Sequence, residues 1–137
     1  MPNNKLLGKT ANLDTCLQRV RAVYGGQRSL FLQDLLKQES VLLNLQRACE
    51  NAIDIANLAV AELELGVPNS SRESFEMLEE ANVISSEITS KMVGMVGFRN
   101  LIVHQYFRID MERVCDLIEN DLDDLSAFAS AVMKKLW

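Results

Sequence analysis

Apolar residues recur every three or four positions through nearly the whole chain. In residues 11–24, ANLDTCLQRVRAVY, this spacing predicts a helix that ends at Gly25-Gly26. From 29 to 65 the chain contains neither proline nor glycine, and apolar residues continue at helical spacing. The pattern predicts one long amphipathic helix there, bent near Glu39-Ser40.

Turn-forming residues divide the second half of the chain into shorter helices. The segment GVPNSSRES at 66–74 contains Pro68 and ends the long helix. Beyond it we expect a short helix through 75–82, a helix that runs to 103, and one C-terminal helix whose apolar period continues to Leu136. The expected N-caps of these three helices are Ser71 or Ser74, Ser85 or Ser86, and Asp110.

No segment alternates apolar and polar residues with the period of a strand. The sequence therefore predicts an all-α fold, an up-and-down bundle of four to five helices joined by short loops. Residues 1–137 are expected to form a single domain, since 137 residues can bury a core without disulfides or metals.

Several classes of protein are excluded by composition. No apolar run is long enough to cross a bilayer, and the N-terminus lacks the pattern of a signal peptide, so a cytoplasmic protein without membrane contact is expected. The three cysteines are far apart without a C-x-x-C, and there is a single histidine. We therefore expect buried, reduced thiols, no metal site and no cofactor. The spacing does not favour a catalytic Cys–His pair.

Charge is negative and unevenly distributed. The formal net charge is −5, yet residues 1–50 carry seven Lys or Arg against four Asp or Glu, and residues 51–137 carry seven against fifteen. An acidic chain lacks the broad basic surface that drives non-specific nucleic-acid binding. An RNA substrate would have to meet a few focused arginines, or enter a groove.

The candidate chemistry lies in residues 97–110, GFRNLIVHQYFRID, which contain the only histidine, His104. Arg99, Asn100 and Tyr106 add three more hydrogen-bonding side chains beside apolar neighbours at an expected helix end; these neighbours are Leu101, Ile102, Val103 and Phe107. Arginine matches phosphate oxygens, and histidine can move a proton near neutral pH. This set suits phosphoryl chemistry without a metal; the alternative is a histidine that only satisfies a hydrogen bond in a core or interface.

Spacing limits how Arg99 and His104 can cooperate. On an unbroken helix, residues five positions apart diverge by about 140°. Both side chains can reach one phosphate only if the helix loosens between them, or if a second copy of the chain completes the site. We favour the second arrangement, because a symmetric dimer would place two such pairs in one cleft.

RNLIVHQY fits the R-x4-6-H pattern, and R-x4-H-x-Y more narrowly resembles the HepT toxins of the HEPN ribonuclease superfamily. Three ordered blocks carry the resemblance over roughly residues 30–130. They are ENAIDIANLAV at 50–60, GVPNSSRESFEML at 66–78 and MVGFRNLIVHQYFRID at 95–110.

The resemblance implies a homodimeric toxin that cuts RNA without a metal in its interface cleft, by attack of the ribose 2′-hydroxyl. His104 would act as general base or acid, Arg99 would stabilise the phosphate, and Asn100 would hold substrate or fix the histidine. The implied partner is a minimal nucleotidyltransferase antitoxin, which would silence the toxin by attaching AMP to Tyr106.

Other interpretations remain open from sequence alone. Asp54 lies among apolar residues of the long helix, where a solvated or hydrogen-bonded position competes with a role in lining the cleft or steadying an arginine. A non-catalytic helical module that binds a nucleotide or a partner protein would agree with the acidic charge. A structural helical dimer is a third possibility. The intact R-x4-H-x-Y favours the enzyme.

Overall fold

Residues 3–136 are described by a computed structural model, and they contain seven α-helices and one short 3₁₀-helix but no strand. The all-α prediction is confirmed, although the helices outnumber the expected four to five. The elements are α1 (Asn4–Tyr24), α2 (Arg28–Leu32), α3 (Leu35–Glu62), α4 (Ser71–Glu80), α5 (Ser86–His104), η1 (Tyr106–Arg108), α6 (Met111–Asn120) and α7 (Leu122–Leu136).

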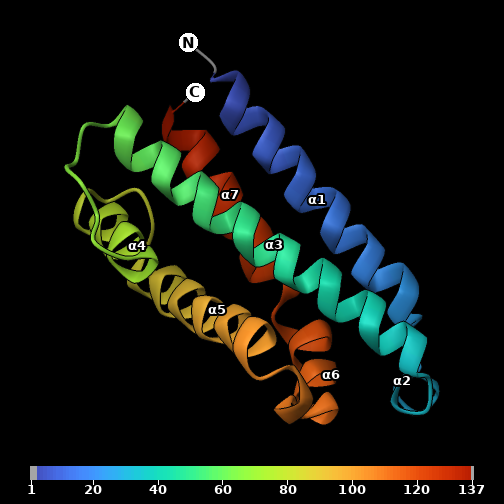
Figure 1. Ribbon diagram of the computed structural model, residues 1–137. Coiled ribbons are helices and arrows are strands. Elements are labelled where there is room, and N and C mark those ends of the chain that lie inside the picture. The colour runs from blue at the N-terminus through green and yellow to red at the C-terminus, as the bar shows by residue number, and fades with distance from the viewer. Residues whose placement is uncertain (1–2, 137) are drawn as a thin grey trace.

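The longest helix, α3, occupies the middle of the fold (Figure 1). It packs against α1 on one side and against α4 and α5 on the other, while α7 lies behind it and also contacts α5. Apolar side chains from all of these helices meet in one core, where Phe31, Phe75 and Phe128 are fully buried. The candidate residues of 97–110 lie at the C-terminal end of α5 and just beyond it.

The expectation of a single helix from 29 to 65 is wrong, because the chain breaks at Gln33 and Asp34. The Asp34 carboxylate accepts a hydrogen bond from the backbone N–H of Lys37 at 3.1 Å and so begins α3. The Gln38 amide donates to two carbonyl oxygens at the end of α2, at 3.0 and 3.2 Å. Two polar side chains therefore satisfy the backbone groups exposed by the break.

The C-terminal helix is also divided, since α6 ends at Asn120 and α7 begins at Leu122. The apolar period continues across Asp121, so periodicity alone did not reveal the break. These two breaks, at Asp34 and Asp121, account for the difference in helix number.

Most of the predicted helix ends agree with the structure, and some do not. Gly25, in the left-handed conformation at φ 70°, ends α1 as predicted, while the helix begins earlier than expected, after the N-cap Asn3. Ser85 and Asp110 are N-caps as predicted. The cap of α4 is Ser70, not Ser71 or Ser74; the Ser74 hydroxyl is buried and donates to Asn57 at 2.6 Å.

Arg28 ties α2 to α6, the helix that follows the candidate site. Its guanidinium donates to Asp116 at 2.7 Å and to Glu119 at 2.7 Å. The hydrogen bond from Arg28 holds the pKa of Glu119 below its ordinary value.

Within residues 3–136, no helix combines the length and apolarity needed to span a membrane.

Candidate active site

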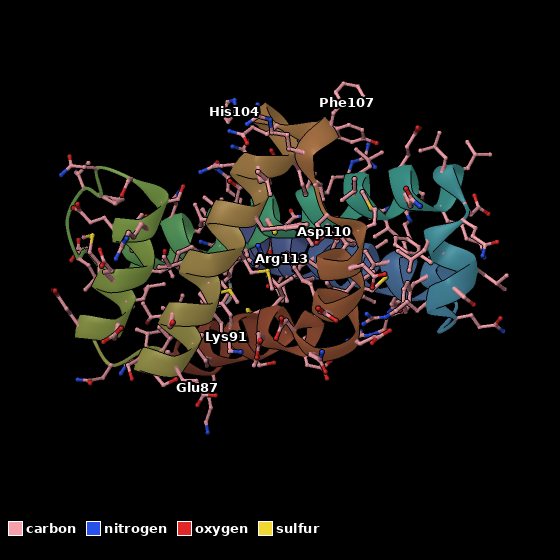
Figure 2. All side chains as sticks on the ribbon, turned by 90° about the horizontal axis from the view of Figure 1, so that it is seen from below. Glu87, Lys91, His104, Phe107, Asp110 and Arg113 are labelled. Atoms are coloured by element: carbon pink, nitrogen blue, oxygen red, sulfur yellow. The ribbon has the colours of Figure 1, made fainter. Side chains whose placement is uncertain are left out.

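His104 is the last residue of α5 and is exposed at the edge of the molecule (Figure 2). The helix runs without interruption from Ser86 to His104, so Arg99 and His104 lie on one regular helix. Their directions therefore differ by about 140°. The option in which the helix loosens between them is wrong for this chain.

Arg99 points toward α3, where Glu50 holds it. Its Nη2 lies 2.8 Å and its Nε 3.2 Å from the same oxygen of Glu50, and the two side chains are 30% and 38% exposed. An ion pair with this exposure contributes ~0–1 kcal/mol to stability. It fixes the direction of the guanidinium while leaving part of it open to an anion.

Asn100 and Asp54 are placed differently from each other. The exposed Asn100 accepts a hydrogen bond from Nη1 of Arg99 at 3.2 Å. Asp54, on α3, pairs with Lys9 of α1 at 2.9 Å, so the carboxylate that steadies Arg99 is Glu50 instead. The roles expected for Asn100 and Asp54 in binding substrate stay predictions.

Tyr106 begins η1, two residues beyond His104, and its ring meets that of Phe107 nearly edge-on, with centroids 5.5 Å apart. Burial raises the pKa of the Tyr106 phenol above its ordinary value, and the negative charge of Glu39 on α3 raises it further. The phenol is therefore protonated at neutral pH. To act as a nucleophile, Tyr106 would need a separate base that removes its proton.

Replacing Glu39 by glutamine is expected to lower the pKa of Tyr106, because it removes the negative charge that disfavours the phenolate. The measurement is the ultraviolet absorbance of tyrosinate against pH, in a Tyr24→Phe background that leaves one tyrosine. Glu80→Gln, an exposed position on α4, is the matched control. An unchanged Tyr106 titration in Glu39→Gln would contradict the expected coupling.

Large apolar side chains are exposed on α3, at the end of α5 and on η1, and we call them the exposed apolar patch. Phe107 is 98% exposed and Leu36, on α3, is 78% exposed. Glu39, whose charge acts on Tyr106, lies on α3 between Leu36 and Leu43. A patch of this kind marks an interaction surface. Its large residues are Leu36, Leu43, Val103, Tyr106 and Phe107.

The cysteines are buried thiols, as predicted. Burial raises the pKa of Cys49 to about 12, and the pKa values of Cys16 and Cys115 are also raised, chiefly by burial. Thiols of this kind are poor nucleophiles. In the part of the chain that the structure describes, no three His, Cys, Asp or Glu side chains group in a way that could hold a metal ion.

Sequence reasoning missed Glu50 as the partner of Arg99. Glu50 and Asp54 are four positions apart on α3 and therefore share one side of the helix. Which of the two faces α5 depends on the packing of α3 between its neighbours, and periodicity does not report that. The nearly complete exposure of Phe107 is also a tertiary property that no local pattern showed.

Comparisons with known proteins identify the family of this chain. Residues 13–132 match the family described as Ribonuclease HepT-like. Over 130 residues the chain is 38% identical to the mRNA nuclease HepT of Shewanella oneidensis, with coverage of 95% of this chain and 97% of that protein. The chain therefore belongs to the HepT-like ribonuclease family, and the resemblance to HEPN toxins is confirmed.

Solved structures show the same fold. A tri-AMPylated HEPN toxin of Shewanella oneidensis, in complex with an MNT antitoxin, matches with a TM-score of 0.91 and 38% identity over 97% of this chain and 99% of that one. YutE, a cytosolic protein of unknown function from Bacillus subtilis, matches with a TM-score of 0.70 at 16% identity, over 90% of each chain, and shows the fold alone.

Proposed function

We propose that this protein is the toxin of a HEPN/nucleotidyltransferase toxin–antitoxin pair, and that it is an endoribonuclease that needs no metal. The observation that carries the proposal is the pair Arg99 and His104 at the exposed end of α5. It occurs in a chain that is 38% identical, over nearly its full length, to an mRNA nuclease. Localisation in the cytoplasm, where RNA is available, belongs to the same proposal.

The proposed reaction is an internal transfer at phosphorus. The ribose 2′-oxygen attacks the adjacent phosphorus, the bond from phosphorus to the 5′-oxygen breaks, and a 2′,3′-cyclic phosphate remains. The imidazole of His104 either removes the proton from the 2′-hydroxyl or donates a proton to the leaving 5′-oxygen. Arg99 stabilises the negative charge that develops on the phosphate oxygens. Asn100 would assist in holding the substrate.

A homodimer would bring these groups together. Because α5 is unbroken, Arg99 and His104 of one chain point in directions that differ by about 140°. The exposed apolar patch beside them offers the surface that a second copy would cover, with Phe107 98% exposed and Leu36 78% exposed. In a two-fold dimer, His104 of one subunit would then act with Arg99 of the other.

The proposed regulation of the nuclease is a modification of Tyr106. A related toxin has been solved in tri-AMPylated form with its MNT antitoxin. AMP attached to Tyr106 would place bulk and negative charge two residues from His104 and beside the patch. Since the Tyr106 phenol has a raised pKa, the nucleotidyltransferase partner would have to supply the base for this reaction.

The alternative is a non-catalytic module that binds a nucleotide or a partner protein. The net charge of −5 and the pairing of Arg99 with Glu50 favour it, because both reduce the positive charge available to RNA. The exposed His104 favours the enzyme, since binding alone does not require an imidazole that can take up or give a proton.

The test is cleavage of single-stranded RNA by unmodified protein in excess EDTA, with the 3′ ends of the products identified. The expected result is undiminished cleavage that leaves 2′,3′-cyclic phosphate. A circular dichroism spectrum with full helicity is the control for folding. Loss of cleavage in EDTA that returns with added Mg²⁺ would contradict metal independence, and a folded protein that cuts no RNA would contradict the nuclease.

A further inference from the structure

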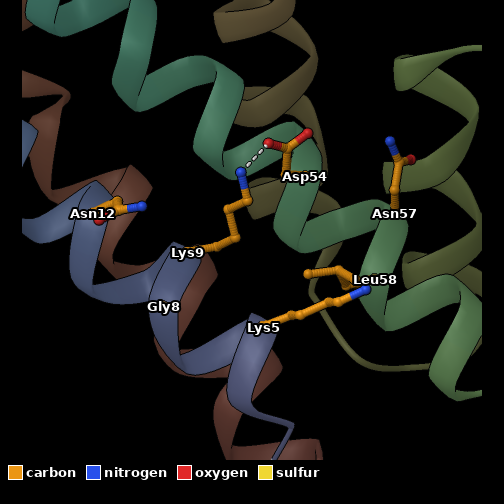
Figure 3. A pocket seen from close by; sticks show the side chains of 7 residues that line it. All are labelled: Lys5, Gly8, Lys9, Asn12, Asp54, Asn57 and Leu58. Carbon is orange, nitrogen blue, oxygen red and sulfur yellow. Dashed lines mark ion pairs between the residues drawn. The ribbon is translucent and has the colours of Figure 1, made fainter.

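A groove lined by polar and charged side chains, with some apolar surface, runs between α1 and α3. It consists of two adjoining cavities of about 530 and 420 Å³, which share Lys9 and Asp54 in their linings. Figure 3 shows the first cavity, where Lys9 extends from α1 to Asp54 of α3 and Lys5 extends toward Leu58 of the same helix. We call this feature the α1/α3 groove.

Positive charge collects in this groove although the chain as a whole is acidic. Its lining includes four cationic residues, Lys5, Lys9, Arg19 and Arg47, and two acidic ones, Glu50 and Asp54. Both carboxylates are already paired, Asp54 with Lys9 at 2.9 Å and Glu50 with Arg99 at 2.8 Å. Within residues 3–136, no carboxylate lies within ion-pair distance of the three other cations that line the groove.

The groove is long enough to bind several consecutive phosphates, because its cations are spread along α1. Lys5 and Arg19 are on one side of α1 and fourteen positions apart, which corresponds to about 21 Å along the helix axis. Glu50 lines the groove and also holds Arg99, so the groove leads to the candidate active site.

We propose that the α1/α3 groove binds the sugar–phosphate backbone of single-stranded RNA and leads it to Arg99, an inference that rests on the proposed nuclease function. Lysine and arginine side chains attract phosphates, while the side-chain amides of Asn12 and Asn51 offer hydrogen bonds to phosphate or ribose oxygens. No aromatic residue lines either cavity, so bases have no surface on which to stack. Binding in the groove is therefore independent of base sequence.

Asp54 acts against RNA in this arrangement. Its ion pair with Lys9 joins side chains that are 40% and 46% exposed, and a pair so open to water is readily replaced by a phosphate. The free carboxylate would then repel the RNA backbone. Removal of its charge should strengthen binding, a direction opposite to that expected from a residue that merely supports the fold.

The experiment is fluorescence anisotropy of a labelled single-stranded RNA, with the full-length chain in a His104→Ala background that prevents cleavage. Arg19→Gln/Arg47→Gln is expected to raise Kd roughly fivefold to tenfold and to make the slope of log K against log salt shallower by about 0.7 per lost contact. Asp54→Asn is expected to lower Kd severalfold. Lys134→Gln/Lys135→Gln, which removes two exposed charges from α7, is the matched control.

Equal weakening of binding in the groove variant and in the α7 control would overturn the proposal, because it would reduce the effect to net charge. Unchanged RNA binding in the groove variant, with loss of its complex with the nucleotidyltransferase, would overturn it in favour of a protein-binding groove. RNA cleavage by the wild-type chain, with His104 intact, is measured in parallel. If the wild-type chain cuts RNA while the groove variant binds RNA normally, the groove proposal fails but the proposed nuclease function is retained.

Discussion

The substitution His104→Ala is expected to reduce the rate of RNA cleavage by roughly 10²–10⁴-fold, the usual contribution of a general acid or base. The side chain is exposed at the end of α5, so its removal leaves the core intact. The loss should appear in kcat more than in KM, because the proton transfer occurs in the transition state. The measurement is the single-turnover cleavage rate, compared with Gln105→Ala, a change at the exposed neighbouring residue.

Arg99→Ala belongs to the same prediction, with an expected loss of roughly 10²–10³-fold from the stabilisation of phosphate charge. Arg99→Lys should recover only part of the activity, because lysine lacks the planar fork of arginine. Arg72→Ala is a matched control, since Arg72 also forms an exposed ion pair, with Glu76 on α4. Cleavage by folded Arg99→Ala at the rate of the Arg72 variant would contradict the assigned role.

Much of the fold could be predicted from the sequence because local signals dominate it. Gly25 ends α1, and Ser85 and Asp110 begin α5 and α6, each through its own backbone or side-chain chemistry. The break before α3 was missed because Asp34 lies inside an uninterrupted apolar pattern. Its effect depends on Gln38, whose amide satisfies the carbonyl groups at the end of α2.

The candidate site could be predicted only as a set of residues. The side-chain chemistry of Arg99 and His104 indicated phosphoryl chemistry, and the family resemblance supported it. The pairing of Arg99 with Glu50 depends on how α5 packs against α3, which is a tertiary property. The charge of the α1/α3 groove was equally hidden, because its cations come from two helices that the linear sequence separates.

The second prediction is that two variants, each with a defect in a different catalytic residue, restore activity when they form a dimer. On an unbroken α5, one chain cannot direct both Arg99 and His104 at the same phosphate, so the active cleft is expected to combine the two residues in trans. Two inactive variants, Arg99→Ala and His104→Ala, should then restore activity when they share a dimer. One of the two composite pairs in such a heterodimer is intact, and the other lacks both groups.

The measurement that tests this account most directly is RNA cleavage by purified heterodimers of these two variants, isolated with a different affinity tag on each subunit. The account predicts roughly half of the wild-type rate, far above that of either parent homodimer. The two parent homodimers, carried through the same purification, are the controls. Heterodimers that cleave no faster than the parents would contradict a cleft in which Arg99 of one subunit acts with His104 of the other.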